Sequence, residues 1–268
     1  MDLIKVPLIG EPTAKILKKH GIGNVEQLAT LTIDNPLSKI VSNFSLIVNY
    51  AKAIVRKELI INKDITSVFD TIESKNIYFF DAEYNSNYST TGPYAVFILG
   101  WMDMNNKTHQ LFLEDPQDEL KLLRGFSEWV KTESPLLIAY GSKSGDVLEL
   151  GKCFSRYDMS FTHIENSFFD VYANVVFTQN VNKQKYFLPI VKSGLKPLGL
   201  KNVSKCLGYR QSNLKISNGR DAPREYKRYL RGEHKMAKKK IKKELLRYNQ
   251  EDLKRTKFIY DILKKRLL

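Results

Sequence analysis

Hydrophobic residues recur at helical spacing through the first part of the chain. Three stretches, residues 14–17, 25–31 and 40–55, each gather their apolar residues on one side of a helix. The chain then becomes polar over residues 61–74. The pattern predicts a small all-helical domain over residues 1–60, followed by a linker over 61–74.

The turns between these predicted helices carry their own signals. Glu11-Pro12 favours a helix start, because proline is tolerated at a first helical position. Gly21 suits the left-handed conformation that often ends a helix. Asn24 is placed to cap the next helix by accepting a hydrogen bond from its backbone.

From Asn76 onward the pattern changes to short apolar or alternating runs, which are typical of strands. The runs fall at residues 77–80, 95–101, 109–113, 136–140 and 168–170. Amphipathic helices are expected at 118–129 and 147–157, and further helices follow the last strand. We therefore expect an α/β fold over residues 75–268, with a mixed five-stranded sheet flanked by helices.

Composition excludes several classes of protein. The 268 residues are 43% hydrophobic and 27% charged, which is ordinary for a globular protein and wrong for a disordered one. No run approaches the roughly 18 uncharged apolar residues of a membrane span, and the first residues lack the apolar stretch typical of a secretion signal. Cys153 and Cys206 are too few for a disulfide scaffold, so we expect a cytoplasmic protein.

The net charge of +14 is concentrated toward one end of the chain. Residues 183–268 hold 26 Lys+Arg against 7 Asp+Glu, a balance of +19, whereas the preceding 182 residues have a balance of −5. Such a basic segment is typical of contact with a polyanion, most often nucleic-acid phosphate. A solvated lysine-rich surface is the alternative interpretation. A membrane partner is not expected, because the basic helices carry no clear Trp/Phe insertion face.

Acidic residues fall at the ends of several predicted elements. Asp81 and Glu83 lie two apart at the end of a strand, so they project to the same side of it. Asp146 opens the helix after the fourth strand. Tyr248 and Asp252, four apart, lie on one face of the last helix.

Four carboxylates from three distant segments do not converge comfortably without cations. Around two Mg²⁺ or Mn²⁺ ions about 4 Å apart, they would form a clamp for in-line phosphodiester hydrolysis. Hard oxygen ligands suit these ions and do not suit zinc. Asp170 also ends a strand and is the alternative ligand to Asp146. Taken singly, each of these residues has an ordinary structural interpretation as a turn former, helix cap or core residue.

In this order, the segments Asp81-Ala82-Glu83, Asp146 and Tyr248-Asn249-Gln250-Glu251-Asp252 resemble the three motifs of the DEDD, DnaQ-like 3′–5′ exonucleases. The set looks most similar to the YprB-like ribonuclease H domain, and residues 194–198 resemble a loop of that group. The resemblance covers roughly residues 75–268 and implies a ribonuclease H-like fold.

The resemblance also implies roles for these residues. Asp81, Glu83, Asp146 and Asp252 would bind the two divalent cations. Tyr248 would orient the attacking water, whose pKa a bound metal lowers toward neutrality.

Two positions depart from the family's pattern. Tyr84 follows Glu83 where the family commonly has Thr or Ser. Gly145 precedes Asp146 where an aromatic residue is usual. In the family, the residue at the first position contacts the terminal nucleotide. The second position precedes Asp146 and therefore affects the assignment of Asp146 as a metal ligand.

The N-terminal segment resembles a helix–hairpin–helix DNA-binding module. In such modules, tight glycine turns expose backbone N–H groups that hold a phosphate without reading sequence. A small helical bundle used for protein contacts is the alternative. The candidates for the phosphate contact are Gly10, Lys18, Lys19, Gly21 and Gly23.

A basic connector carries a further set of candidate nucleic-acid contacts. Tyr226 and Tyr229 are interleaved with its cations, so their rings either stack on unpaired bases or pack within the protein. The cations expected to grip phosphates are Arg220, Arg224, Lys227, Arg228 and Arg231.

The sequence therefore predicts two-metal hydrolysis of phosphodiester bonds in nucleic acid. A 3′–5′ exonuclease acting on DNA rather than RNA is the leading hypothesis. A structure-specific DNA endonuclease or a ribonuclease on the same fold stays open. A non-catalytic nucleic-acid-binding protein is the alternative from a different class.

Overall fold

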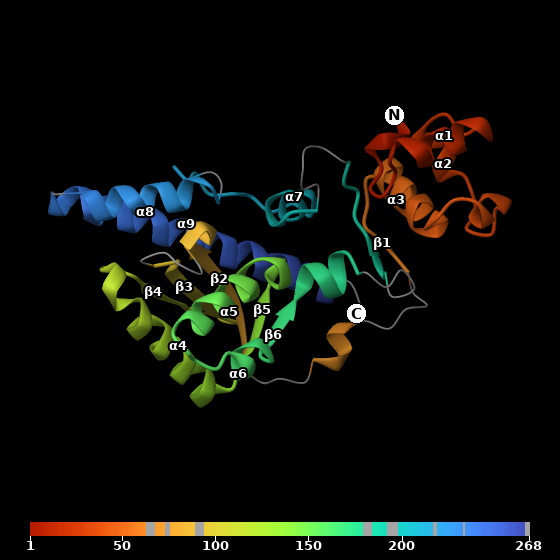
Figure 1. Ribbon diagram of the computed structural model, residues 1–268. Helices are drawn as coiled ribbons and strands as arrows, with labels where there is room; N and C mark the ends of the chain where they lie inside the picture. The colour runs from red at the N-terminus through yellow and green to blue at the C-terminus, as the bar shows by residue number, and fades with distance from the viewer. Residues whose placement is uncertain are drawn as a thin grey trace. The chain divides into compact units, whose positions relative to one another are not determined.

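The chain divides into two units, which are described separately (Figure 1). The computed structural model describes residues 1–62, 68–72, 76–88, 94–178, 184–191, 198–216, 219–232 and 234–265. The first unit comprises Met1–Ile72, Tyr172–Tyr209 and Lys264–Leu268. The second comprises Glu73–Val171 and Arg210–Leu263.

A mixed five-stranded sheet lies at the centre of the second unit (Figure 1). Its order is β4-β3-β2-β5-β6, in which β2 pairs antiparallel with β3 and parallel with β5. The strands are β2 (Ile77–Tyr84), β3 (Val96–Asp103), β4 (Thr108–Phe112), β5 (Leu136–Ala139) and β6 (Phe168–Asp170). The predicted α/β fold with a mixed five-stranded sheet is confirmed.

Helices cover both faces of this sheet, as the alternation of side chains along β2 shows. The Phe80 ring contacts Phe126 of α4 (Glu119–Glu133), with 5.4 Å between centroids. The Phe79 ring contacts Tyr260 of α9 (Lys235–Lys265) at 5.5 Å. Because neighbouring strand residues point to opposite faces, α4 and α9 lie on opposite sides of the sheet. The remaining helices of this unit are α5 (Asp146–Arg156), α6 (Thr162–Glu165) and α8 (Asp221–Arg231).

The first unit contains the helices that the sequence predicts over its first 60 residues. They are α1 (Glu11–Lys19), α2 (Val25–Ala29) and α3 (Phe44–Arg56). Gly21 has φ +80° and so adopts the left-handed conformation expected of a helix stop. Asn24 caps α2 as predicted, since its Oδ1 accepts from the Gln27 backbone N–H at 2.8 Å.

The segment Tyr172–Tyr209 completes the first unit, although it follows the last strand of the sheet in sequence. It opens with a π-helical turn, Tyr172–Val176, and ends after α7 (Leu200–Cys206). Between them, β7 (Tyr186–Phe187) pairs antiparallel with β1 (Ile60–Ile61). The N-terminal helices therefore pack against a strand that comes from far along the chain.

Two further expectations from composition can be compared with the structure. Both cysteines are free thiols, Cys153 buried and Cys206 partly exposed. In the part of the chain that the structure describes, no helix has the length and apolar character needed to cross a membrane. Residues 194–197 of the family-like loop lie outside the described residues.

Glu119 connects three elements of the second unit from a fully buried position. Its Oε1 accepts from the backbone N–H groups of Ala95 and Val96 at 2.7 and 2.9 Å. Its Oε2 accepts from Tyr157 Oη at 2.9 Å and pairs with Arg156. One carboxylate thus joins the start of β3, the start of α4 and the end of α5.

We predict that Glu119→Ala destabilises the fold by about 3 kcal/mol, because it leaves Arg156 and two backbone donors without their buried acceptor. The free energy of unfolding in urea measures the loss. The control is Glu128→Ala, which removes an exposed ion pair with Lys131 on the same helix and should cost less than about 1 kcal/mol. Equal losses in the two variants would show that Glu119 has no special role.

Candidate active site

Strand β2 directs two carboxylates toward α9. Asp81 and Glu83 share the strand parity of Phe79, whose ring contacts Tyr260 on α9. The predicted same-side placement of the two acids therefore holds, and both face the last helix. Glu83 is 7% exposed, so its charge lies largely out of contact with water.

Helix α9 brings a third carboxylate to this face. One oxygen each of Asp81, Glu83 and Asp252 lie within 4.8 Å of one another. We call these three residues the carboxylate cluster. Three hard oxygen donors this close together are a ligand set that suits Mg²⁺ or Mn²⁺.

Asp146 and Asp170 differ in what their carboxylates do. Asp146, at the start of α5, lines the same cavity as the carboxylate cluster. Asp170, at the end of β6, accepts from the backbone N–H groups of Gly141 and Lys143 at 2.8 and 3.0 Å. Asp170 therefore shapes the loop that leads into α5, and Asp146 is the acid that reaches the cavity.

Tyr84 and Gly145, the two departures from the family pattern, lie side by side. A Cβ placed on Gly145 would be 3.2 Å from the Tyr84 hydroxyl oxygen. The Tyr84 side chain therefore takes the space that a larger residue before Asp146 would need. The absence of a side chain at position 145 is matched by the presence of a large one at position 84.

The cavity that these acids line has a volume of about 590 Å³. Its acidic floor consists of the carboxylate cluster and Asp146, and Tyr248 lies beside them. Asn85, Ser86 and Asn87, which follow β2, form a neutral polar wall. Three cations also line the cavity and are called the cationic wall: Arg220, Arg224 and Lys227.

The acidic floor shifts the titration of its own members. Burial raises the pKa of Asp81 well above its ordinary range, and the charges of Glu83, Asp146 and Asp252 raise it further. A hydrogen bond from Asn249 opposes these effects. Without a cation, Asp81 therefore holds a proton at a pH where an ordinary aspartate is ionised.

Asp146 shows the same behaviour. Burial, followed by the charges of Asp170 and Asp252, raises the pKa of Asp146 to about 8. A divalent cation displaces such protons, because its ligands must be deprotonated. Burial and the neighbouring charges thus favour the protonated forms of these acids in the absence of a cation.

Tyr248 stays protonated beside these acids. The side chain is 3% exposed, and burial raises the pKa of its hydroxyl, followed by the charges of Glu83 and Asp252. A Cβ on Gly219 would lie 3.9 Å from the hydroxyl oxygen, so this turn approaches Tyr248 closely. A hydrogen bond with Asp252 raises the pKa further, so the neutral hydroxyl is engaged with this acid.

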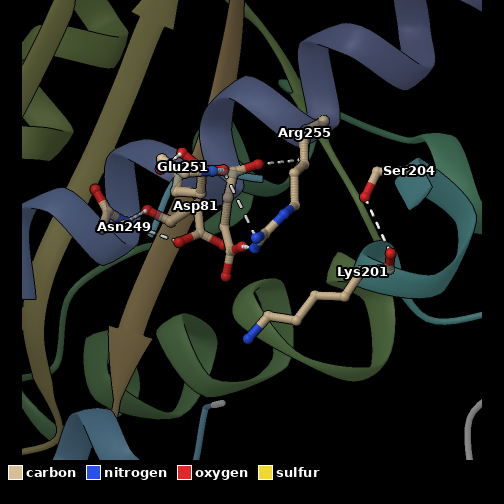
Figure 2. A network of polar contacts seen from close by, with 9 residues as sticks. Asp81, Lys201, Ser204, Asn249, Glu251 and Arg255 are labelled. Carbon is tan, nitrogen blue, oxygen red and sulfur yellow. Dashed lines mark hydrogen bonds and ion pairs between the residues drawn. The ribbon is translucent and has the colours of Figure 1, made fainter. Parts of the chain in front are cut away.

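Asn249 orients Asp81, a role that the sequence did not reveal. Its Nδ2 donates to Asp81 Oδ2 at 2.8 Å and to the Asp81 backbone oxygen at 3.1 Å (Figure 2). Its Oδ1 accepts from Gln110 Nε2 at 2.8 Å. Gly100 lies opposite Asp81 in the sheet, and a Cβ there would be 2.1 Å from Asn249 Oδ1. The glycine within a buried strand was the available signal, since it often marks a close approach.

Arg255 is the buried cation of the site. It is 1% exposed, pairs with Asp252 Oδ1 one turn earlier on α9 and lies 3.7 Å from Glu251 Oε1 (Figure 2). Glu251 also accepts from the Ser212 hydroxyl at 2.5 Å. The spacing of three and four residues along the helix was the signal for this pairing. Arg255 fixes Asp252 and offsets part of the negative charge.

The predicted cations of the basic connector separate into two groups. Arg220, Arg224 and Lys227 line the cavity. Arg228 pairs with Glu225 at 2.8 Å, and neither it nor the exposed Arg231 lines the cavity. Only the first group is brought to the carboxylates.

The two tyrosines of the connector lie in the core. Tyr226 is fully buried, stacks on Phe97 at 4.5 Å and donates from its hydroxyl to the Leu113 carbonyl at 2.7 Å. Tyr229 is 6% exposed. Their rings therefore pack within the protein and do not offer a stacking surface to bases.

The glycine turn of the first unit gathers the residues predicted to contact phosphate there. Lys18 and Lys19 end α1, and Gly21 and Gly23 form the turn that leads to α2, while Gly10 lies at the start of α1. The Gly21 N–H donates to the Lys18 carbonyl at 3.1 Å. The Gly23 N–H donates to Gln27 Oε1 at 2.7 Å, so a phosphate here would have to replace that side chain.

Comparison with known proteins gives a family and similar solved structures. A family model described as the RNase_H superfamily matches residues 78–264, which include all four acids of the floor. The family B DNA polymerase from the hyperthermophilic archaeon Pyrobaculum calidifontis is a similar solved structure, with 18% identity and a TM-score of 0.47. The similarity covers 69% of this chain and 24% of the polymerase chain. No curated protein matches the sequence.

We predict that Asp146→Asn becomes more stable relative to the wild type as pH rises from about 5 to about 8 in metal-free buffer. The folded chain keeps this proton up to about pH 8 while the unfolded chain releases it near its ordinary value, so the wild type loses stability with rising pH, by up to about 1.4 kcal/mol per pH unit. Thermal unfolding at several pH values measures the difference. Asp261→Asn, at a 44% exposed position on α9, is the control. A difference that does not vary with pH would contradict the prediction.

We predict that Gly100→Ala weakens Mn²⁺ binding by about 10-fold or more, because the added methyl group displaces Asn249 and releases Asp81. Titration calorimetry with Mn²⁺ measures the affinity. The control is Gly125→Ala in α4, where a Cβ meets no atom within 4 Å and should stabilise the helix by about 0.5 kcal/mol. Unchanged Mn²⁺ affinity in Gly100→Ala would show that Asn249 does not orient a metal ligand.

Proposed function

The chain belongs to the RNase_H superfamily, and on this premise we propose that it is a divalent-metal-dependent nuclease that hydrolyses phosphodiester bonds in nucleic acid. The observation that carries the proposal is the approach of Asp81, Glu83 and Asp252 to within 4.8 Å, with Asp146 on the same cavity. Acids from β2, α5 and α9 meet there, although they are far apart in sequence.

The acidic floor would hold two divalent cations, Mg²⁺ or Mn²⁺. Bound there, the cations would lower the pKa of a water and neutralise charge on the phosphoryl group. Asp81 would act in the orientation set by Asn249, and Asp252 in the orientation set by Arg255. The carboxylate oxygens suit these cations as ligands. The pKa values of Asp81 and Asp146 are raised, and a bound cation would favour the deprotonated form of both acids.

Tyr248 would position the water that attacks phosphorus. Its buried, protonated hydroxyl lies at the acidic floor and is hydrogen-bonded to Asp252, and it would exchange that bond for one to the oxygen of the attacking water. In the reaction, the water oxygen forms a bond to phosphorus, the bond to the leaving sugar oxygen breaks, and that oxygen takes a proton. Tyr248 is therefore a catalytic residue of this proposal, and it is not the base.

A 3′–5′ exonuclease acting on DNA is the activity that we favour. The order of the three acidic motifs supports the polarity by resemblance. The volume of about 590 Å³ is that of a small-ligand pocket, which suits the end of a strand better than an uninterrupted duplex. The glycine turn of the first unit, with Lys18 and Lys19, would hold DNA phosphate in the manner of a helix–hairpin–helix module.

We predict that the protein shortens 5′-labelled DNA stepwise in Mg²⁺ or Mn²⁺ and that Asp81→Asn and Asp252→Asn each lower the rate on the order of 10³-fold. Metal assistance is worth several kcal/mol, which corresponds to that factor. Gel analysis of single-stranded, duplex and overhang DNA, and of RNA, measures the products. Asp261→Asn on the same helix as Asp252 is the matched control and should keep the wild-type rate.

Other products would change the assignment in a defined way. Discrete internal cuts would indicate an endonuclease, and cleavage of RNA alone would indicate a ribonuclease. Cleavage that survives both substitutions would place the chemistry outside the acidic floor. No cleavage of any substrate would favour a non-catalytic nucleic-acid-binding protein.

A further inference from the structure

Two tyrosines line the cavity beside the acidic floor, and they belong to different elements. Tyr248 lies on α9, and its hydroxyl is hydrogen-bonded to Asp252 on the same helix. Tyr84 ends β2, and its hydroxyl oxygen would lie 3.2 Å from a Cβ on Gly145, the residue before α5. In the proposed reaction only Tyr248 has a role, so the second hydroxyl at the floor needs an explanation.

The two hydroxyls reach the floor from opposite sides of the sheet. Helix α9 covers one face and α4 covers the other, as the ring contacts of β2 show. Helix α5 lies with α4, because Tyr157, just after the end of α5, donates to Glu119 at the start of α4 at 2.9 Å. Tyr84 therefore approaches the floor from the α5 side, and Tyr248 approaches it from the α9 side.

Local features of the chain bring the Tyr84 hydroxyl to the start of α5. The register between β2 and β3 shifts between Glu83 and Tyr84, and such irregularities change the direction of a side chain next to many active sites. A tyrosine hydroxyl lies at the far end of a ring, so it extends further from the strand than the hydroxyl of serine or threonine. Gly145 has no side chain, and this leaves the space that the hydroxyl occupies.

The charges around Tyr84 are consistent with this position. Burial raises the pKa of the Tyr84 hydroxyl, and the charges of Asp146 and Glu149 on α5 raise it further. The charges of Asp81 and Glu83 have smaller effects on the same pKa. The hydroxyl therefore lies at the Asp146 end of the floor and keeps the proton that makes it a hydrogen-bond donor.

The geometry of phosphodiester hydrolysis gives the two sides different roles. In an in-line displacement, the attacking water and the leaving oxygen lie on opposite sides of phosphorus. Tyr248 would position the water on the α9 side, so the leaving oxygen departs toward the α5 side, where Tyr84 lies. Negative charge develops on that oxygen as its bond to phosphorus breaks, and a fixed hydrogen-bond donor stabilises such charge.

We propose that the Tyr84 hydroxyl donates a hydrogen bond to the leaving sugar oxygen, which makes Tyr84 a second catalytic residue of this site. The water oxygen bonds to phosphorus, the bond from phosphorus to the sugar oxygen breaks, and the sugar oxygen carries negative charge until a solvent water protonates it. Tyr84 keeps its own proton throughout. The inference rests on the proposed function and deepens it, because it assigns the leaving-group side of the same site.

The test compares two leaving groups. A 5′-labelled single-stranded oligodeoxynucleotide is prepared with either oxygen or sulfur at the 3′-bridging position of its last linkage, and single-turnover cleavage is followed in Mn²⁺. Oxygen leaves as a strongly basic alkoxide, whereas sulfur leaves as a weakly basic thiolate that does not need the hydrogen bond. Tyr84→Phe should cleave the oxygen substrate on the order of 10²-fold more slowly than the wild type and the sulfur substrate at the wild-type rate.

Two further variants make the pattern specific. Tyr78→Phe removes a hydroxyl near the start of β2, where the ring contacts Trp129 at 5.1 Å, and should cleave both substrates at the wild-type rate. Tyr248→Phe should slow both substrates by the same factor, because Tyr248 would act on the attacking water and not on the leaving atom.

Binding measurements separate a catalytic role of Tyr84 from a structural one. Tyr84→Phe should keep the wild-type affinity for Mn²⁺, measured by titration calorimetry. It should also keep the wild-type Kd for the oligonucleotide, measured by fluorescence anisotropy in Ca²⁺. Both affinities are unchanged because the proposed hydrogen bond strengthens only as charge develops on the leaving oxygen.

The contrary outcomes distinguish the inference from the proposed function. If Tyr84→Phe slows both substrates equally, or cleaves the oxygen substrate at the wild-type rate, the hydrolysis stands and Tyr84 does not contact the leaving oxygen. If Tyr84→Phe weakens oligonucleotide binding as much as it slows cleavage, the hydroxyl holds the bound strand and the inference is overturned. If the wild type cleaves neither substrate, the proposed hydrolysis and the inference both fail.

Discussion

The mutual repulsion of carboxylates packed between β2 and α9 is the constraint on which the rest of the site depends. Three of them approach within 4.8 Å, and a fourth lines the same cavity. Burial raises the pKa values of Asp81 and Asp146 and the charges of neighbouring acids raise them further, so the fold alone does not stabilise the ionised cluster. Arg255 offsets part of the negative charge of the carboxylates. Divalent cations would supply the positive charge that the site still lacks.

The fold meets this constraint with a few specific contacts around the cluster. Strand parity points Asp81 and Glu83 toward α9, and Gly100 leaves room on the neighbouring strand for Asn249. The buried Glu119 joins β3, α4 and the end of α5, and Asp170 holds the loop that leads into Asp146. The charged cavity is thus supported by apolar packing and by buried polar contacts outside it.

The sheet and its acids were largely predictable from sequence. Buried strands appear in the sequence as apolar runs, and the acidic residues at the ends of these runs are easily identified. The contacts that orient the acids were not predictable in the same way. Asn249 and Arg255 reach the acids because of the way α9 is oriented about its axis on the sheet. The orientation of α8 likewise decides that Arg224 lines the cavity and Arg228 does not. Tyr172–Tyr209 joins the first unit because β7 pairs with β1, a long-range pairing of two-residue strands that local pattern does not reveal.

The central claim is that the cluster of Asp81, Glu83 and Asp252, together with Asp146, is a site for divalent cations. Equilibrium dialysis against Mn²⁺ at neutral pH, with bound metal counted per chain, tests it most directly. The account predicts two bound ions per wild-type chain and fewer than one in Asp81→Asn, with release of protons on binding. No bound Mn²⁺ in the wild type, or the same number in both proteins, would contradict it.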